Sequence, residues 1–191
     1  MSLTLGVLAS GRGSNFLAVQ KAIEAEDLDA RIAVLVSDRP QAPALDLART
    51  HGIAAEFIPY QTSDRSAFER PAIARLQKEN CDLILLAGFM RILTPEFIHS
   101  FPGKILNIHP SLLPSFKGLN PQRQALEAGV KFSGCTVHVV TDELDAGPIL
   151  AQAVVPVLDG DTEETLSARI LKEEHKIYAD VVRKRLNAAS H

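Results

Sequence analysis

The sequence is short of residues on which several common classes of protein depend. It has no tryptophan, two cysteines and 5% aromatic residues. Cys81 and Cys135 lie far apart in the chain without metal-ligand spacing, and we interpret both as small buried thiols kept reduced in the cytoplasm. No histidine pair stands at ligand spacing from a cysteine or carboxylate, so we predict no metal site.

Long hydrophobic runs and an excess of basic residues are also missing. The apolar run 3–9 is too short to span a bilayer, and it lacks the basic lead and cleavage site of a signal peptide. A net charge of −3 argues against a nucleic-acid partner, although a cleft for a small anion stays open. We therefore expect a cytoplasmic protein that binds neither membrane nor nucleic acid.

The residues that are present suit one globular unit. Hydrophobic residues make up 46% and charged residues 23% of the chain, which is ordinary for a soluble domain. A length of 191 residues fits one domain or two closely fused halves.

Hydrophobic patterning in the first half alternates between strands and helices. The strands are uniformly apolar, which is typical of a parallel sheet covered on both faces. Because helices connect them, the pattern indicates a doubly wound arrangement with right-handed crossovers. We expect strands at 3–9, 31–37, 56–58 and 82–87, and helices at 15–26, 42–51 and 66–80.

The pattern changes after Pro102. We expect a strand at 104–108, a proline-rich loop at 109–120, a short helix at 123–128, an antiparallel hairpin of strands 136–140 and 149–157, and a long helix from Thr162. The sequence thus predicts a single α/β domain over residues 1–191. Its N-terminal half is Rossmann-like and parallel, and its mixed sheet is antiparallel in the C-terminal part.

A glycine-rich turn, 11–16, joins the first strand to the first helix. Phe16 stands where a dinucleotide fingerprint needs glycine, although Asp38 after the second strand keeps that interpretation open. No Gly-Lys-Ser/Thr follows, which excludes a Walker loop. A single phosphate at the helix N-terminus, with Ser14 and Asn15 as additional donors, fits better. A plain strand-to-helix turn is the alternative.

Asn107 and His109 are two residues apart on an extended segment, so they share one face. Such a strand end is where open α/β sheets bind ligands. An amide donor beside an imidazole suits acyl transfer, because one stabilises an oxyanion while the other donates a proton or a hydrogen bond. A structural histidine is the alternative. The rigid loop Pro110–Pro114 favours the functional interpretation.

The acidic turn after residue 140 supplies a candidate partner for His109. Asp145 precedes Ala-Gly-Pro, so its carboxylate is held rigidly and could face the histidine, although an acidic turn is commonly just solvated. His51, His99 and His191 are expected at the surface. His138 lies inside a strand, and we interpret it as a satisfied core group.

Together these residues resemble the phosphoribosylglycinamide formyltransferase family over essentially the full length. The stretches L-N-I-H-P-S-L-L-P from 106 and S-G-C-T-V-H-V-V-T-D-E-L-D-A-G-P-I-L-A-Q from 133 look like signatures of folate-dependent formyltransferases. The G-x-G-S-N turn and A-G-F-M-R-I-L, 87–93, are closer to the glycinamide ribonucleotide branch.

The resemblance implies a reaction, its residues and its co-substrate. Asn107, His109 and Asp145 would be catalytic, with the amine of 5-phosphoribosylglycinamide attacking the formyl carbon of 10-formyltetrahydrofolate directly, in purine (IMP) synthesis. Asn107 and protonated His109 would stabilise the oxyanion. Asp145 would orient His109 and raise its basicity, or manage proton exit through a water. No metal is implied.

Binding residues follow from the same resemblance. Residues 1–100 would hold the ribonucleotide phosphate, and 101–191 would carry catalysis and most of the folate site. The ribonucleotide set is Gly13, Ser14, Asn15 and Glu174, the last alternatively an ordinary exposed helix residue. The folate set is Arg65, Met90, Arg91, Ile92, Leu93, Asn107, Val140, Thr141, Asp142, Glu143, Leu144 and Asp145.

Two local features also follow from it. The Leu113–Pro114 peptide is expected to be cis. Gln122 stands where relatives often carry histidine, so a secondary substrate contact from that position is in doubt.

Three other functions compete. A transfer-RNA formyltransferase would need a further basic C-terminal domain, and a formylfolate hydrolase would carry an extra N-terminal domain. A non-catalytic nucleotide-binding module would not need Asn107, His109 and Asp145 together. We expect a monomer or a homodimer.

Overall fold

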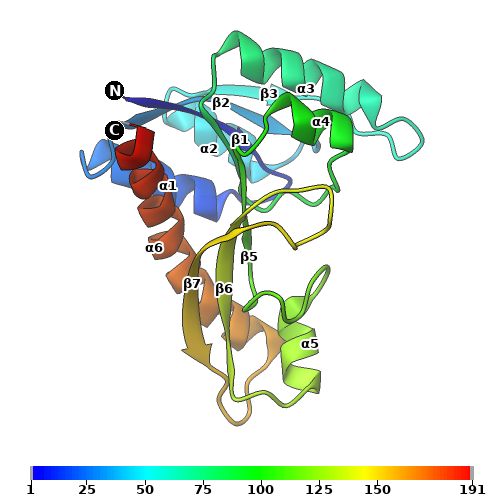
Figure 1. The fold of residues 1–191 in the computed structure, drawn as a ribbon, viewed down its shortest axis with the longest axis vertical. Helices are drawn as coiled ribbons and strands as arrows, with labels where there is room; N and C mark the ends of the chain where they lie inside the picture. The colour runs from blue at the N-terminus through cyan, green and yellow to red at the C-terminus, as the bar shows by residue number, and fades with distance from the viewer. Residues whose placement is uncertain (1, 190–191) are drawn as a thin grey trace.

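One mixed sheet organises the computed structural model, which describes residues 2–189 (Figure 1). Across these residues the strand order is β3-β2-β1-β4-β5-β6-β7. The strands are β1 (Leu3–Leu8), β2 (Ala30–Ser37), β3 (Ala54–Phe57), β4 (Leu83–Leu86), β5 (Ile105–His109), β6 (Phe132–Val139) and β7 (Ile149–Pro156). The helices are α1 (Ser14–Glu24), α2 (Pro43–Thr50), α3 (Ser66–Lys78), α4 (Pro95–Ser100), α5 (Pro121–Glu127) and α6 (Glu163–Ala189).

Strands β1 to β5 are parallel, and β1, β2, β4 and β5 are largely buried, whereas the edge strand β3 is partly exposed. On one face, Leu5, Val7 and Leu85 pack with Phe16 of α1 and Tyr178 of α6. The opposite face packs against α3 and α4. Side chains on both faces are apolar because both faces are covered, which confirms the expected doubly wound half.

Strands β6 and β7 complete the sheet in the antiparallel direction, and α6 packs against both. The predicted hairpin is confirmed, but β6 begins four residues before Thr136, at Phe132. A Cβ on Gly134 would lie 1.9 Å from the Ala153 carbonyl oxygen and 2.8 Å from Leu112 Cδ2. Gly134 therefore lets the loop and the neighbouring strand approach β6 closely.

Helix α4 was not predicted. It is too short to show a helical period, and it begins at Pro95 behind Thr94, whose hydroxyl accepts from the Phe97 N–H. The expected cis peptide between Leu113 and Pro114 is confirmed. Among the described helices, none is both long enough and apolar enough to cross a membrane.

Candidate active site

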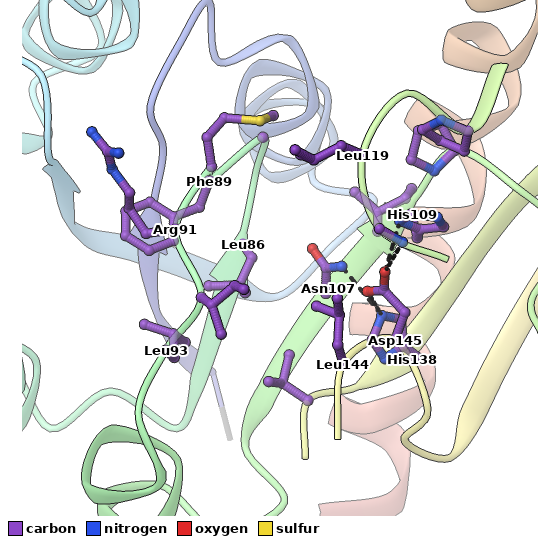
Figure 2. A pocket seen from close by; sticks show the side chains of 18 of the residues that line it. Leu86, Phe89, Arg91, Leu93, Asn107, His109, Leu119, His138, Leu144 and Asp145 are labelled. Carbon is purple, nitrogen blue, oxygen red and sulfur yellow. Dashed lines mark hydrogen bonds and ion pairs between the residues drawn. The ribbon is translucent and has the colours of Figure 1, made fainter. Parts of the chain in front are cut away.

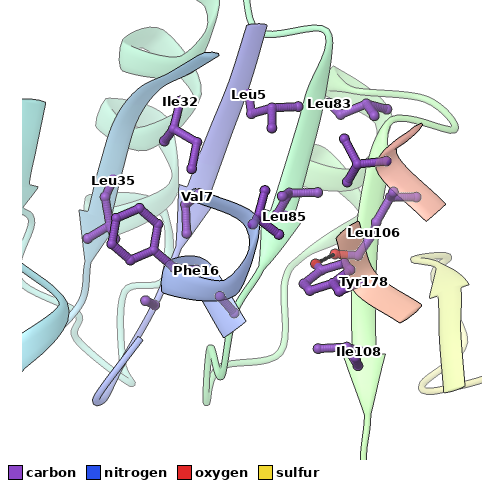
Figure 3. Close-up of a cluster of buried hydrophobic side chains, with 14 of the residues drawn as sticks. Leu5, Val7, Phe16, Ile32, Leu35, Leu83, Leu85, Leu106, Ile108 and Tyr178 are labelled. Atoms are coloured by element: carbon purple, nitrogen blue, oxygen red, sulfur yellow. Dashed lines mark hydrogen bonds between the residues drawn. The ribbon is translucent and has the colours of Figure 1, made fainter. Parts of the chain in front are cut away.

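Strand β5 carries two of the candidate residues because of its place in the sheet. It pairs in parallel with β4, with Leu86 opposite Asn107, and antiparallel with β6, with Asn107 opposite His138. Beneath this point the Tyr178 hydroxyl bridges the carbonyl oxygens of Leu86 and Leu106, at 3.1 and 2.9 Å (Figure 3). Tyr178 thus supports the ends of both strands from the helix layer.

The antiparallel register brings His138 into hydrogen-bond contact with Asn107. His138 Nδ1 lies 3.1 Å from the Val139 carbonyl oxygen, so Nδ1 carries the proton and donates to it. Nε2 is then an acceptor, and Asn107 Nδ2 donates to it over 3.2 Å. Burial is the main cause that lowers the pKa of His138, which keeps the ring neutral and preserves this pairing. The arrangement fixes which end of the Asn107 amide is the donor.

His109 lies between two acceptors. Its Nε2 donates to the Phe116 carbonyl oxygen over 2.9 Å, and its Nδ1 is 3.5 Å from Asp145 Oδ2. The same oxygen of Asp145 accepts from the Gly118 N–H at 2.9 Å. His109 and Asp145 are both buried, at 7% side-chain exposure each. Oxygen acceptors therefore face both ring nitrogens of His109 and fix the orientation of the ring.

The turn after β6 aims Asp145 inward. Asp145 itself has φ of 49°, and a Cβ on Gly147 would lie 1.8 Å from the Val139 carbonyl oxygen. Val139 in turn donates its N–H to Pro148 at 2.9 Å. The turn therefore folds tightly onto the end of β6, and its carboxylate faces the β5 side chains.

A cavity of about 500 Å³ opens beside these residues (Figure 2). This volume suits a drug-sized ligand, and the walls are mostly apolar with polar groups gathered at one end. Four segments line it, together with Leu86, Ile98 and His138: Gly88–Leu93 after β4, Asn107–Pro110, Gly118–Gln122 leading into the first turn of α5, and Val140–Asp145 after β6. Every residue of the expected folate set except Arg65 is among them. Arg65 is exposed at the start of α3.

Buried polar side chains hold the wall segment Gly88–Leu93 in place through hydrogen bonds. Ser10 Oγ accepts from the Met90 N–H at 2.8 Å, and Asp38 Oδ2 accepts from Arg91 Nε at 2.7 Å. The Arg91 guanidinium also lies over the Tyr60 ring, 4.4 Å from its centre. Just beyond, buried Glu69 accepts from the Thr94 N–H at 2.9 Å. Arg91 therefore contributes its backbone and aliphatic stem to the wall, while its charge is engaged by Asp38.

The expected phosphate turn lies at the end of the neighbouring strand β1. Gly13 has φ of 73°, and a Cβ added to it would lie 2.8 Å from the Cβ of Ala44. The absence of a side chain at Gly13 therefore makes room for Ala44. No side chain caps α1 at Gly13, so the N-terminus of the helix keeps its donors. Ser10 joins this turn to the cavity wall, since its N–H also donates to the Gly88 carbonyl at 3.1 Å.

Asn15 and Glu174, 159 residues apart in sequence, meet behind this turn. Asn15 Nδ2 donates to Glu174 Oε2 over 2.8 Å, and both residues are more than nine-tenths buried. Burial, the larger cause, raises the pKa of Glu174, while the hydrogen bond from Asn15 opposes this. The alternative that Glu174 is an ordinary exposed helix residue is wrong.

Some site residues were missed from the sequence. His138 is a satisfied core group, as interpreted, but it also orients Asn107, and only the β5–β6 register reveals this. Gly118 and Phe116 act through backbone atoms, which no residue pattern identifies. Gln122, at which a secondary substrate contact was in doubt, lines the cavity. Among the described residues, no group of three or more metal-ligating side chains is placed to hold a metal ion.

Comparison with known proteins connects this geometry to a family. A family model described as formyl transferase matches residues 4–182. The phosphoribosylglycinamide formyltransferase of Bacillus subtilis is 43% identical over 94% of this chain and 93% of its own length. The crystal structure of glycinamide ribonucleotide transformylase 1 from Symbiobacterium toebii superposes with a TM-score of 0.92 at 48% identity, covering 95% of this chain and 86% of that one.

Fold similarity extends beyond transferases. A formyltetrahydrofolate deformylase from Pseudomonas syringae superposes with a TM-score of 0.93, but it is 29% identical and this chain covers 62% of its length. The superposition alone therefore does not separate the two activities, whereas sequence identity favours the transferases. With the family model spanning both halves of the sheet and the polar end of the cavity, the chain belongs to the formyl transferase family.

Proposed function

We propose that this protein transfers the formyl group of 10-formyltetrahydrofolate to the amine of 5-phosphoribosylglycinamide, giving the N-formyl product and tetrahydrofolate in purine (IMP) biosynthesis. The observation that carries the proposal is the convergence of Asn107, His109 and Asp145 at the polar end of a cavity of about 500 Å³. Relatives named for this reaction, at 43% identity over almost the whole chain, support the same substrates.

In the proposed reaction the amine nitrogen bonds to the formyl carbon, and the formyl oxygen becomes an oxyanion. Asn107 Nδ2 has two N–H bonds, of which one is engaged by His138, so the second is available to that oxygen. Because His138 fixes the amide, the donor is oriented before substrate binds. Collapse of the intermediate breaks the bond to folate N10, which takes up a proton as the former amine loses one.

His109 is the second proposed donor to the oxyanion. Its Nε2 proton now bonds to the Phe116 carbonyl, so donation to substrate means exchanging one oxygen acceptor for another. Asp145 Oδ2 lies 3.5 Å from Nδ1, where it is placed to accept from the ring and to orient it. These groups act by charge stabilisation and proton transfer, and the proposal needs no acyl-enzyme.

The substrates would occupy adjacent regions. Gly13, Ser14 and Asn15 would bind the ribonucleotide phosphate at the start of α1, with Glu174 contacting the same substrate. The folate would lie between the segments 88–93 and 140–145, whose apolar side chains and backbone suit a flat ring. Arg65, exposed outside the cavity, is proposed for the outer end of the folate.

A labelled formyl donor tests the proposal. The purified protein is incubated with 10-formyltetrahydrofolate labelled in the formyl group, with and without 5-phosphoribosylglycinamide. We expect label in the ribonucleotide product only when the amine is present. Label released as formate without the amine would make the protein a hydrolase, and no turnover would leave a binding module. Transfer from formate with ATP instead would refute the folate assignment.

The remaining expectations are part of the proposal. We propose a cytoplasmic location, with cell fractionation as the test. For the oligomeric state we propose a monomer or homodimer, which light scattering on the purified protein distinguishes from larger assemblies.

A further inference from the structure

We propose that Gln124 is a positioning residue for Asp145, acting through the backbone of the loop before α5. The inference rests on the proposed function. Gln124 is half-buried on α5 and does not line the cavity, so any effect on the reaction passes through the groups that it holds.

Gln124 grips this loop at two points. Its Nε2 donates to the carbonyl oxygens of Lys117 and Leu119, at 3.1 and 2.9 Å. A primary amide has two N–H bonds, and each here has its own acceptor. The Lys117 carbonyl belongs to the peptide that precedes Gly118, and the Leu119 carbonyl belongs to the peptide between Leu119 and Asn120, so one side chain holds a peptide group before Gly118 and another after Leu119.

The peptide between Lys117 and Gly118 connects the Gln124 side chain to Asp145 in the active site. A trans peptide is planar, so its C=O and N–H point in opposite directions. When Gln124 holds the Lys117 carbonyl, the Gly118 N–H is aimed the other way, where it donates to Asp145 Oδ2 at 2.9 Å. Gly118 has φ of 78°, a conformation that glycine adopts without strain.

The same loop also contacts His109. The Phe116 carbonyl accepts from His109 Nε2 at 2.9 Å, one peptide before the group that Gln124 holds. A second side-chain contact of the loop, Lys117 Nζ to Glu143 at 3.3 Å, joins a partly exposed lysine to a largely exposed carboxylate and therefore holds weakly. Gln124 is therefore the firmer link between α5 and the His109–Asp145 pair.

The alternative is that Gln124 merely ties α5 to its preceding loop. That role would alter stability but would not depend on whether residue 145 is charged. A positioning role makes the effect of Gln124 depend on the Asp145 carboxylate, because displacing the Gly118 N–H matters only if an anion receives it.

The test compares Gln124→Glu, which replaces the donor by an acceptor, with Gln124→Met, which removes the donor at similar size. Gln77→Glu, the same change at an exposed position of α3, is the control. Kinetics in the wild-type and Asp145→Asn backgrounds are combined with amide exchange of Gly118 measured by NMR. We expect both Gln124 variants to lose roughly 10- to 100-fold in kcat, with little change in KM for the ribonucleotide.

In the Asp145→Asn background the further loss should shrink to about threefold or less, because the two residues act as one unit. Gly118 amide exchange should accelerate in both Gln124 variants and stay unchanged in Gln77→Glu. An equal loss in both backgrounds, or a loss in KM alone, would overturn the proposal. Unchanged Gly118 exchange would overturn it whatever reaction the protein catalyses, whereas failure of wild-type formyl transfer would refute the proposed function instead.

Discussion

Asn107 Nδ2 and His138 Nε2 lie 3.2 Å apart across the β5–β6 pair, and the histidine can accept only because its Nδ1 proton bonds to the Val139 carbonyl. The amide is thus oriented by a ring in a defined neutral tautomer. The orientation of the proposed oxyanion donor therefore depends on the register between β5 and β6, which places His138 opposite Asn107.

Removing the donor should affect the transition state. We expect Asn107→Ala to lower kcat by roughly 10²–10³-fold, because one oxyanion donor is lost, while affinity for both substrates changes little. Steady-state kinetics with separate calorimetric affinities measure the two effects. A loss confined to affinity would make Asn107 a binding contact only.

The His138 tautomer predicts a pH dependence of stability. Burial lowers the pKa of His138 below 6.5, so the unfolded chain takes up the proton more readily than the native one. The contribution to the free energy of unfolding is fully present above about pH 6.5 and is lost as pH falls through the native pKa. Urea titrations should show a shallower acid loss for His138→Gln than for wild type; parallel curves would contradict this.

The phosphate turn predicts selective loss of one substrate. We expect Ser14→Ala to weaken binding of the ribonucleotide while binding of a folate analogue stays nearly unchanged, because the turn lies outside the cavity. Ser100→Ala on α4 is the matched control. Equal weakening of both ligands in calorimetry would mean that Ser14 supports the fold rather than the phosphate.

Replacement of Glu174 should have opposite effects on the stability of the protein and on binding of the ribonucleotide. Burial raises the pKa of Glu174 above 4.5, so its contribution to stability is fully present below pH 4.5 and is lost as pH rises through the native pKa. Glu174→Gln removes the buried charge and offers a donor to Asn15 Oδ1, for which the described residues provide no hydrogen-bond partner. We expect the thermal midpoint at pH 8 to rise by roughly 2–4 °C, about 1 kcal/mol for a chain of this size.

The same variant should bind the ribonucleotide less tightly, because the proposed contact loses its charge. Scanning calorimetry at pH 4 and pH 8 provides the control, since the gain should vanish at the lower pH. If the thermal midpoint of Glu174→Gln at pH 8 is lower than that of the wild type, the surroundings of the Glu174 carboxylate compensate for its burial.

Patterns within one segment were readable from the sequence. Asn107 and His109 share a face because they are two apart, and the apolar strands near 31–37 and 82–87 indicated the parallel core. The rest depends on contacts between distant segments. His138 became a site residue through register, and Asn15 and Glu174 met only after α1 and α6 packed together.

Hydrogen-bond partners that the backbone supplies are even harder to predict from the sequence. Phe116 and Gly118 contribute a carbonyl and an N–H that any residue possesses, so their side chains gave no signal. Helix α4 escaped because six residues cannot establish a period. Nor does the sequence show that close approach by Ala153 and Leu112 requires glycine at position 134, inside β6.

The Tyr178 hydroxyl between the Leu86 and Leu106 carbonyls also sets an order on maturation during synthesis. Strands β1 to β5 are synthesised before α6, so the two carbonyls receive the Tyr178 hydroxyl only after that later helix has been made. His138 and Asp145 are likewise translated well after Asn107. In a nascent chain the Tyr178 contacts, and the approach of His138 and Asp145 to Asn107 and His109, can therefore form only after these later segments have been synthesised.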